Sequence, residues 1–383
     1  MDTLFRAKPY IPPESKEWIL DKFDDILTTG GLIQGKYVAE FEEKIKKLVK
    51  VENAIATTSC GTGLETVLMA SGIKGKKFIV PTQTFAASVN CIIRSGNIPL
   101  IVDVDSETQC LSMEIILQNM DEDVAGIVLV NMAGLITPEM LSIEEYCDDN
   151  GLFLLTDDAH SLGASYYDVY MDHIRFAGSF GDAGVFSFYP SKIITTAEGG
   201  MITTNDDKLA EKCRVIRNHG TVRNEMLVKG LDYGVTCEIP STNYRMTEFC
   251  AVLGLSQLKY LDTFLEKRNT IADEYKRELK DIDWLDTAPT YSFIQQSWWQ
   301  YIVKINDGRA RTTLLKKLLD EYKIPTANAY WPLCHQQSIY KDYLSPHGYK
   351  NSEELIMKVF SLPMYYELAI TQVYEICEAI REV

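Results

Sequence analysis

One lysine, Lys192, stands in a setting that does not explain it as an ordinary surface residue. It follows the apolar run VFSFYP within GVFSFYPSKIITTAEGG, residues 184–200. Lysine is among the residues least often fully buried, so a solvated turn lysine is the simplest interpretation. A lysine amine whose pKa is lowered by desolvation or by nearby positive charge is also a nucleophile and a general base. The position of Lys192 after an apolar strand leaves both interpretations open.

Two carboxylates, Asp157 and Asp158, end a second apolar run, LFLLTDD at residues 152–158. Ligands of open α/β sheets bind at the carboxyl ends of the strands, where these residues are expected to lie. Neighbouring strand residues point to opposite faces, so only one of the two can face a given ligand. The competing interpretation is a helix cap by either aspartate, with His160 on the surface of that helix.

The third feature is a glycine turn, SCGTG at residues 59–63, between a strand-like run and a helical pattern. Glycines let the backbone approach a ligand closely, and the first turn of a helix presents N–H groups without intrahelical partners. Such a helix N-terminus binds phosphate. An ordinary N-cap by Ser59 or Thr62 explains the same residues equally simply.

Together these three features predict a site for one cofactor, pyridoxal 5′-phosphate. The helix N-terminus would hold its phosphate, and a carboxylate would pair with the protonated pyridine nitrogen. The lysine amine would form a Schiff base with its aldehyde. This prediction places Lys192 in a turn so that its amine reaches a cleft.

The pattern of apolar runs predicts the scaffold that positions these residues. From about residue 50 to 205, nearly continuous apolar runs alternate with amphipathic stretches, which indicates a mainly parallel sheet flanked by helices. Residues 247–280 form one long helical pattern, and the remainder predicts a smaller α+β unit. We therefore expect an α/β fold with a large domain over residues 1–245 and a small domain over 246–383.

Composition excludes several classes of partner. The chain has 383 residues, a formal net charge of −16, nine cysteines and five histidines. The negative charge disfavours nucleic acid as a partner. No apolar run is long enough for a signal peptide or a membrane span, and the cysteines show no zinc spacing. We expect a cytoplasmic protein with free thiols and no metal site.

Ordered blocks along nearly the whole chain resemble the DegT/DnrJ/StrS sugar aminotransferases. This resemblance implies a pyridoxal-phosphate enzyme of the aspartate-aminotransferase-like fold, fold type I. One such block would be weak evidence, but the ordered set is specific. The blocks are PYIPPESKEWILDKF, GGLIQGKYVAEFEEKI, SCGTGLE, VPTQTFAASVN, PLIVDVDSET, TDDAHSLGA, GDAGVFSFYPSK, EGGMITTND, RNHG, NYRMTEFCAVLGLSQL and SLPMYYEL.

The resemblance also implies a role for each matching residue. Lys192 would be the catalytic Schiff-base lysine, and Asp157, rather than Asp158, would bind the pyridine nitrogen. His160 would lie near the ring and its hydroxyl, and Phe85 would stack on the ring. Core packing is the competing interpretation for Phe85, and turn stabilisation is the competing one for Asn243. The expected phosphate ligands are Gly61, Thr62, Gly63, Ser187 and, from the neighbouring subunit, Asn243.

Three departures from the family pattern bear on the substrate. The family's usual Val-His-Leu-Tyr-Gly is here VNMAG, with Asn131 for His, and its GWLTQG is here GGLIQG, with Gly31 for Trp. The third departure, GTG for GTA, places Gly63 at the turn. The first two positions lie near the substrate side in the family. A looser match places Tyr330, Trp331 and His335 near the sugar pocket.

The resemblance implies an aminotransferase that moves an amino group from L-glutamate to a keto-sugar and releases 2-oxoglutarate. The acceptor would be a nucleotide-linked 3- or 4-keto deoxysugar, used for surface polysaccharide or a glycosylated product. A keto-sugar without a nucleotide is an alternative, given Asn131 and Gly31. A related sugar 3-dehydratase carries His in place of the lysine, and a non-catalytic cofactor-binding regulator is a further alternative. The role of Asn243 implies a homodimer with shared active sites.

Overall fold

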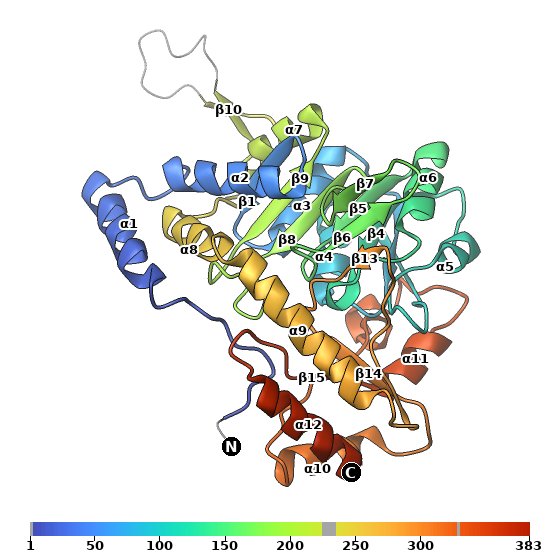
Figure 1. Cartoon of the computed structure of the whole chain (residues 1–383). Helices are drawn as coiled ribbons and strands as arrows, with labels where there is room; N and C mark the ends of the chain where they lie inside the picture. The colour runs from blue at the N-terminus through green and yellow to red at the C-terminus, as the bar shows by residue number, and fades with distance from the viewer. Residues whose placement is uncertain (1–2, 224–234, 328–329) are drawn as a thin grey trace.

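A seven-stranded sheet forms the centre of the computed structural model, which describes residues 3–223, 235–327 and 330–383 (Figure 1). Its strand order is β1-β9-β8-β5-β4-β2-β3. Strands β8, β5, β4, β2 and β3 run parallel, whereas β9 pairs antiparallel with both β1 and β8. The strands are β1 (Asn53–Thr57), β2 (Lys77–Pro81), β3 (Ile98–Val102), β4 (Val124–Val130), β5 (Phe153–Asp157), β8 (Ala183–Ser187) and β9 (Gly200–Thr204).

Helices cover both faces of this sheet, as the nearly continuous apolar strands require. Along β4, Ile127 and Leu129 belong to the core on one face, and Val128 belongs to the core on the other. The Val128 face carries α3 (Cys60–Ser71), α4 (Ala86–Arg94) and α7 (Asp207–Arg217). The opposite face carries α2 (Lys36–Val49), α5 (Met113–Gln118), α6 (Met140–Asn150) and α8 (Glu248–Leu258).

A second apolar core lies around a three-stranded antiparallel sheet, β12-β14-β15. Figure 1 shows α9 running from the large sheet towards this unit, with α12 and α10 beside its far end. The division at residue 245 stays a prediction, and α8, just beyond it, packs on α1 (Ser15–Thr29) and α2. The elements of the unit are α9 (Leu261–Leu279), β12 (Leu285–Asp286), β14 (Tyr301–Ile305), α10 (Arg311–Asp320), α11 (Lys350–Ile356), β15 (Val359–Leu362) and α12 (Ile370–Glu382).

Short elements complete the fold. A small sheet, β13-β6-β7, consists of β6 (Ser165–Asp168), β7 (His173–Phe176) and β13 (Ile294–Gln295), and β10 (Thr221–Arg223) pairs with β11 (Val235–Cys237). Three short 3₁₀ turns span Met132–Gly134, Cys334–Gln336 and Ser338–Tyr340. None of the helices in the described part of the chain has the length and apolarity that a bilayer crossing needs.

The structure corrects two sequence expectations about elements. The single helix predicted over residues 247–280 is two helices, α8 and α9, which are separated at Lys259 and Tyr260. The strand-like run 295–305 is strand only at its ends, because Trp298 adopts a left-handed conformation with φ of 51°. Tertiary packing of the tryptophans there overrides the local strand preference.

Candidate active site

Three segments that are distant in the sequence meet at one edge of the central sheet. Strand β5 ends at Asp157, β8 ends at Ser187, and β1 leads into the N-terminus of α3. Ser187 pairs with Gly200, and a Cβ atom at Gly200 would lie only 2.4 Å from the carbonyl carbon of Ser59. Glycine at this position therefore lets the turn before α3 approach the end of β8.

Asp157 is a buried carboxylate with hydrogen-bond donors but no ion pair among the described residues. Its Oδ2 accepts a hydrogen bond from Ser88 Oγ at 2.7 Å, and its Oδ1 accepts one from the Ala159 N–H at 3.1 Å. The Cys60 thiol lies 3.7 Å from the same Oδ1. Burial raises the pKa of Asp157, and these hydrogen bonds and the charge of Lys192 oppose that shift. The carboxylate is therefore placed to receive a cationic ligand group.

Asp158 points to the other side and is fully satisfied by the protein. Its Oδ2 accepts from Thr156 Oγ1 at 2.6 Å, and its Oδ1 accepts from Ser161 Oγ and Asn131 Nδ2, each at 2.7 Å. Asn131, one of the family departures, is completely buried in this role. These contacts make Asp158 a structural acceptor, which agrees with the choice of Asp157 as the site carboxylate.

The glycine turn forms a capped helix start. Ser59 Oγ accepts from the Thr62 N–H at 3.2 Å, while Thr62 Oγ1 accepts from the Ser59 N–H at 3.1 Å. The Gly63 N–H donates within the helix to Ser59 O, and a Cβ at Gly63 would lie 2.7 Å from Val185 Cγ1. Packing on β8 therefore accounts for glycine at position 63. Gly61 remains as a first-turn N–H without an intrahelical acceptor. The phosphate roles of these three residues stay predictions.

Lys192 reaches inward from its turn rather than towards open solvent. Its backbone N–H donates to Tyr189 O at 2.9 Å, and its Nζ lies 4.0 Å from the ring centre of Trp299. Burial lowers the pKa of Lys192 to about 8, and the Cys60 thiol and Asp157 act in the opposite direction. Lys192 forms no ion pair within the described residues. An amine with this pKa is a usable nucleophile and base near neutral pH.

His160 lies beside Lys192 with one ring nitrogen unsatisfied. Its Nε2 and the Tyr330 hydroxyl are 2.7 Å apart and share a hydrogen bond, whereas its Nδ1 is buried without a partner in the described residues. The imidazole stacks on Trp299 at a centroid distance of 3.8 Å. Burial, with the charge of Lys192, lowers the pKa of His160 well below its usual value. His160 is therefore neutral at pH 7.

The other predicted ligands lie at the margin of this group. Phe85 precedes α4 and is 64% exposed, so in the single chain it does not pack in the core. Ser187 is half-buried, and its Oγ accepts a 3.4 Å bond from the Tyr189 N–H. Asn243 is exposed and accepts a bond from the Arg245 N–H at 3.1 Å. The cofactor contacts of all three stay predictions.

Sequence reasoning missed three residues that the fold brings to this site. Ser88 follows Phe85 by one helical turn, and a buried hydroxyl in an apolar helix was the available signal. Cys60 lies within the recognised glycine turn but was not singled out. Trp299 belongs to the core of the large sheet, but nothing in the run QSWWQ indicates that it lies under Lys192. His335, by contrast, binds Thr82 Oγ1 at 2.7 Å and stacks on Tyr349, which is a structural role.

The residues present fit pyridoxal 5′-phosphate. Asp157 offers an unpaired carboxylate for a ring cation, His160 Nδ1 offers a free hydrogen-bonding atom, and Lys192 offers an amine of lowered pKa. The N-terminus of α3 and the Ser187 hydroxyl lie together for an anion.

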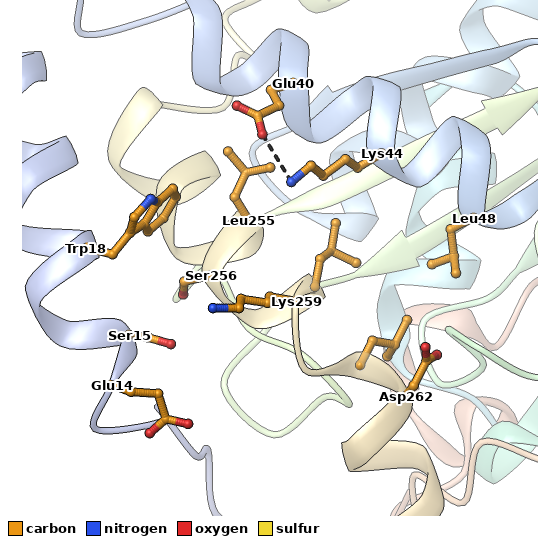
Figure 2. A pocket seen from close by; sticks show the side chains of 12 residues that line it. Glu14, Ser15, Trp18, Glu40, Lys44, Leu48, Leu255, Ser256, Lys259 and Asp262 are labelled. Carbon is orange, nitrogen blue, oxygen red and sulfur yellow. Dashed lines mark ion pairs between the residues drawn. The ribbon is translucent and has the colours of Figure 1, made fainter.

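A separate cavity of about 510 Å³ lies between α1, α2 and the α8–α9 junction. Figure 2 shows the Glu40–Lys44 ion pair on one side of it and Trp18 on another. None of the site residues described above lines this cavity. It is therefore distinct from the group around Lys192.

Comparison with known proteins places this arrangement in a family. The family model for the DegT/DnrJ/EryC1/StrS aminotransferase family matches residues 13–381. The spore coat polysaccharide biosynthesis protein SpsC of Bacillus subtilis is 31% identical over 98% of this chain and 96% of its own length. The GDP-perosamine synthase of Escherichia coli O157:H7 is 30% identical over 98% and 97%. The structure of PseC from Helicobacter pylori, an aminotransferase involved in the biosynthesis of pseudoaminic acid, matches with a TM-score of 0.89 and 25% identity over 100% of this chain and 99% of that one.

The chain belongs to the DegT/DnrJ/EryC1/StrS aminotransferase family. The resemblance stated from the sequence, the fold class and the assignment as a sugar aminotransferase dependent on pyridoxal 5′-phosphate are therefore confirmed.

Proposed function

We propose that this protein transfers an amino group from L-glutamate to a nucleotide-linked 3- or 4-keto deoxysugar. The product is an amino sugar for surface polysaccharide or a glycosylated compound, made in the cytoplasm. The names of the relatives support this class of acceptor, since one makes GDP-perosamine and another serves polysaccharide synthesis. The observation that carries the proposal is the joint placement of Lys192, Asp157 and the α3 N-terminus within a chain of this family.

When bound, pyridoxal phosphate supplies an electron sink and carries the amino group between two half-reactions. The protein's own residues prepare and use it. Asp157 would keep a positive charge on the ring nitrogen, and the α3 N-terminus with Ser187 would hold the phosphate. Lys192 Nζ removes a proton from the α-carbon of glutamate and returns protons in the second half-reaction. Glutamate leaves as 2-oxoglutarate, and the sugar carbonyl becomes an amine.

We also propose that two copies of the chain form the active unit, with a residue of each contributing to the other's site. Phe85 and Asn243 are both exposed in the single chain, although each is expected at the cofactor. Exposed apolar residues along α1 and after it, Leu20, Leu27, Leu32 and Ile33, supply a surface that a second copy would cover. A twofold dimer is the commonest oligomer of soluble proteins.

A panel of keto-sugars tests the acceptor. The enzyme is first converted to its aminated form with L-glutamate and freed of 2-oxoglutarate, and each candidate sugar is then added. We expect a nucleotide-linked keto deoxysugar to restore the yellow form and to yield an amino sugar detected by mass spectrometry. Restoration by the free sugar or sugar acid, but not by nucleotide-linked sugars, would favour the alternative that Gly31 and Asn131 raise.

A further inference from the structure

Trp299 contacts the Lys192 ammonium and two neighbours of the lysine, His160 and Ser191. Its ring lies under the Lys192 ammonium at 4.0 Å and stacks on His160 at a centroid distance of 3.8 Å with 11° between the planes. Its Nε1–H donates to Ser191 O, the residue before the lysine, at 2.7 Å. One indole therefore fixes the lysine's backbone turn and faces its charged end.

The backbone before Trp299 has an energetically unfavourable conformation that its neighbours stabilise. Trp298 has φ of 51°, a left-handed conformation that is unfavourable for a bulky residue. Arg268 is buried and donates from Nη1 to Trp298 O at 2.8 Å, and Ser297 Oγ donates to His160 O at 2.7 Å. These bonds stabilise the conformation and so specify where the indole lies.

Few other charges act on the lysine from the surrounding elements. Asp157 and the Cys60 thiol favour its charged form, and His160 is its neutral neighbour. On its other side, Lys192 lines a cavity of only about 10 Å³. That volume is at the lower limit for one water molecule. The titratable groups that line this cavity with Lys192 are Lys8, Tyr10, Arg268 and Tyr366.

We propose that Trp299 is a positioning residue that seats the Lys192 ammonium on its indole face. The proposal rests on the proposed function, in which Lys192 takes up a proton and later returns it. The protonated lysine therefore needs a defined place in the site. An indole face attracts a cation more strongly as the cation loses water, and Lys192 is partly buried. The seat holds the protonated lysine between removal of a proton from the donor and its return.

The pH dependence of Lys192 in the cofactor-free full chain tests the seat. The rate at which cyanate carbamylates Lys192 is followed by peptide mass spectrometry, and its dependence on pH gives the amine pKa. We expect Trp299→Leu to lower that pKa by about one unit, because the charged form loses its aromatic partner. Trp299→Phe keeps an aromatic face and should retain most of the wild-type value.

Two further variants separate the seat from general packing. Trp284→Leu removes an indole from the other core that lies over Arg309, and it should leave the Lys192 pKa unchanged. Trp299→Met fills volume without an aromatic face, so it replaces Trp299→Leu if that variant does not fold. An unchanged pKa in the folded Leu or Met variant, or an equal fall in the Phe variant, would overturn the proposal. The readout needs neither cofactor nor sugar, so its failure is distinguishable from failure of the proposed function.

Discussion

Two adjacent aspartates have opposite roles because their side chains point to opposite sides of the strand. Asp157 and Asp158 share a strand end, yet one carboxylate faces Ser88 and Cys60 while the other accepts three hydrogen bonds on the opposite side. Strand alternation predicts that only one can meet a ligand, but it does not say which. The family motif selected Asp157, and the contacts of Asp158 give the physical reason.

The two aspartates make a matched pair for mutation. Asp157→Asn should leave the fold intact and lower kcat by about 100-fold or more, because the ring nitrogen loses its charge partner. Asp158→Asn leaves donors unsatisfied in the core and should cost about 1–3 kcal/mol of unfolding free energy. Steady-state kinetics and denaturant unfolding measure the two effects. A stable, inactive Asp158→Asn with a fully active Asp157→Asn would reverse the assignment.

The lowered pKa of Lys192 predicts how cofactor attachment depends on pH. The amine must be neutral to attack an aldehyde, and its pKa is about 8. The rate at which cofactor-free protein becomes yellow with pyridoxal phosphate should therefore rise as the pH increases through about 8 and then level off. Stopped-flow absorbance follows this rate. A rise only near 10.5, the ordinary lysine value, would show that Lys192 is not desolvated.

The lowered pKa of Lys192 also makes the stability of the folded protein depend on pH. Between about 8 and 10.5 the unfolded chain keeps a proton on this lysine that the folded chain has lost. Stability of the cofactor-free protein should therefore gain from this group as the pH rises across that window, and it should lose the gain as the pH falls.

At the scale of elements, one helix is capped by a carboxylate from another. Glu248 of α8 accepts from the Gly35 and Val38 N–H groups through Oε1 and from the Tyr37 N–H through Oε2. These are orphan donors of the first turn of α2. A Cβ at Gly35 would lie 2.8 Å from Glu248 Oε2, which explains the glycine in LIQGKY.

Removing this cap should destabilise the large core. Glu248→Gln keeps the volume but replaces the charged acceptor, and we expect it to cost about 1–3 kcal/mol of unfolding free energy. Glu43→Gln, which breaks an exposed ion pair with Lys47 on the same helix, is the control and should cost less than about 0.5 kcal/mol. Urea denaturation compares them. Equal losses of unfolding free energy in the two variants would mean that the Glu248 cap does not stabilise α2.

Sequence patterns predicted the buried strands better than the helix junctions. Runs such as KFIVP are strands because Phe78, Ile79 and Val80 suit a doubly covered sheet, and β2 spans that run, Lys77–Pro81. The break between α8 and α9 has no glycine or proline to mark it. It arises because Leu261 and Phe264 pack into the core after a turn closed by the Tyr260 N–H and Gln257 O. Such a break depends on tertiary contacts that local propensity does not contain.

At the scale of the whole molecule, the proposed sharing of sites between subunits can be tested by complementation. Lys192→Ala and Asn243→Asp should each be nearly inactive alone. Co-expressed as a mixed dimer, they should recover part of the wild-type activity, because one of the two sites then receives Lys192 from one chain and Asn243 from the other. The control is a mixed dimer of Lys192→Ala with Asp157→Asn. Both residues serve the site of their own chain, so each site keeps one defect and activity should not recover. Absence of recovery in a verified mixed dimer would contradict the shared site.

The residues that carry the site's chemistry could be predicted from the sequence, whereas the residues packed around them could not. Lys192, Asp157 and the turn at 59–63 were predicted to converge because each follows a different strand of one sheet. The contribution of Trp299 could not be predicted, since it depends on a left-handed residue at Trp298 and on the tertiary packing that brings the indole into the large core. Such tertiary contacts follow from the fold as a whole.

The central claim is that the amine of Lys192 is the attachment point of pyridoxal phosphate. Borohydride reduction of the yellow protein, followed by peptide mass spectrometry, tests it most directly. We expect the reduced cofactor's mass on the peptide that contains Lys192, and no such adduct in Lys192→Ala. An adduct on another lysine, or none in the wild-type protein, would contradict the account.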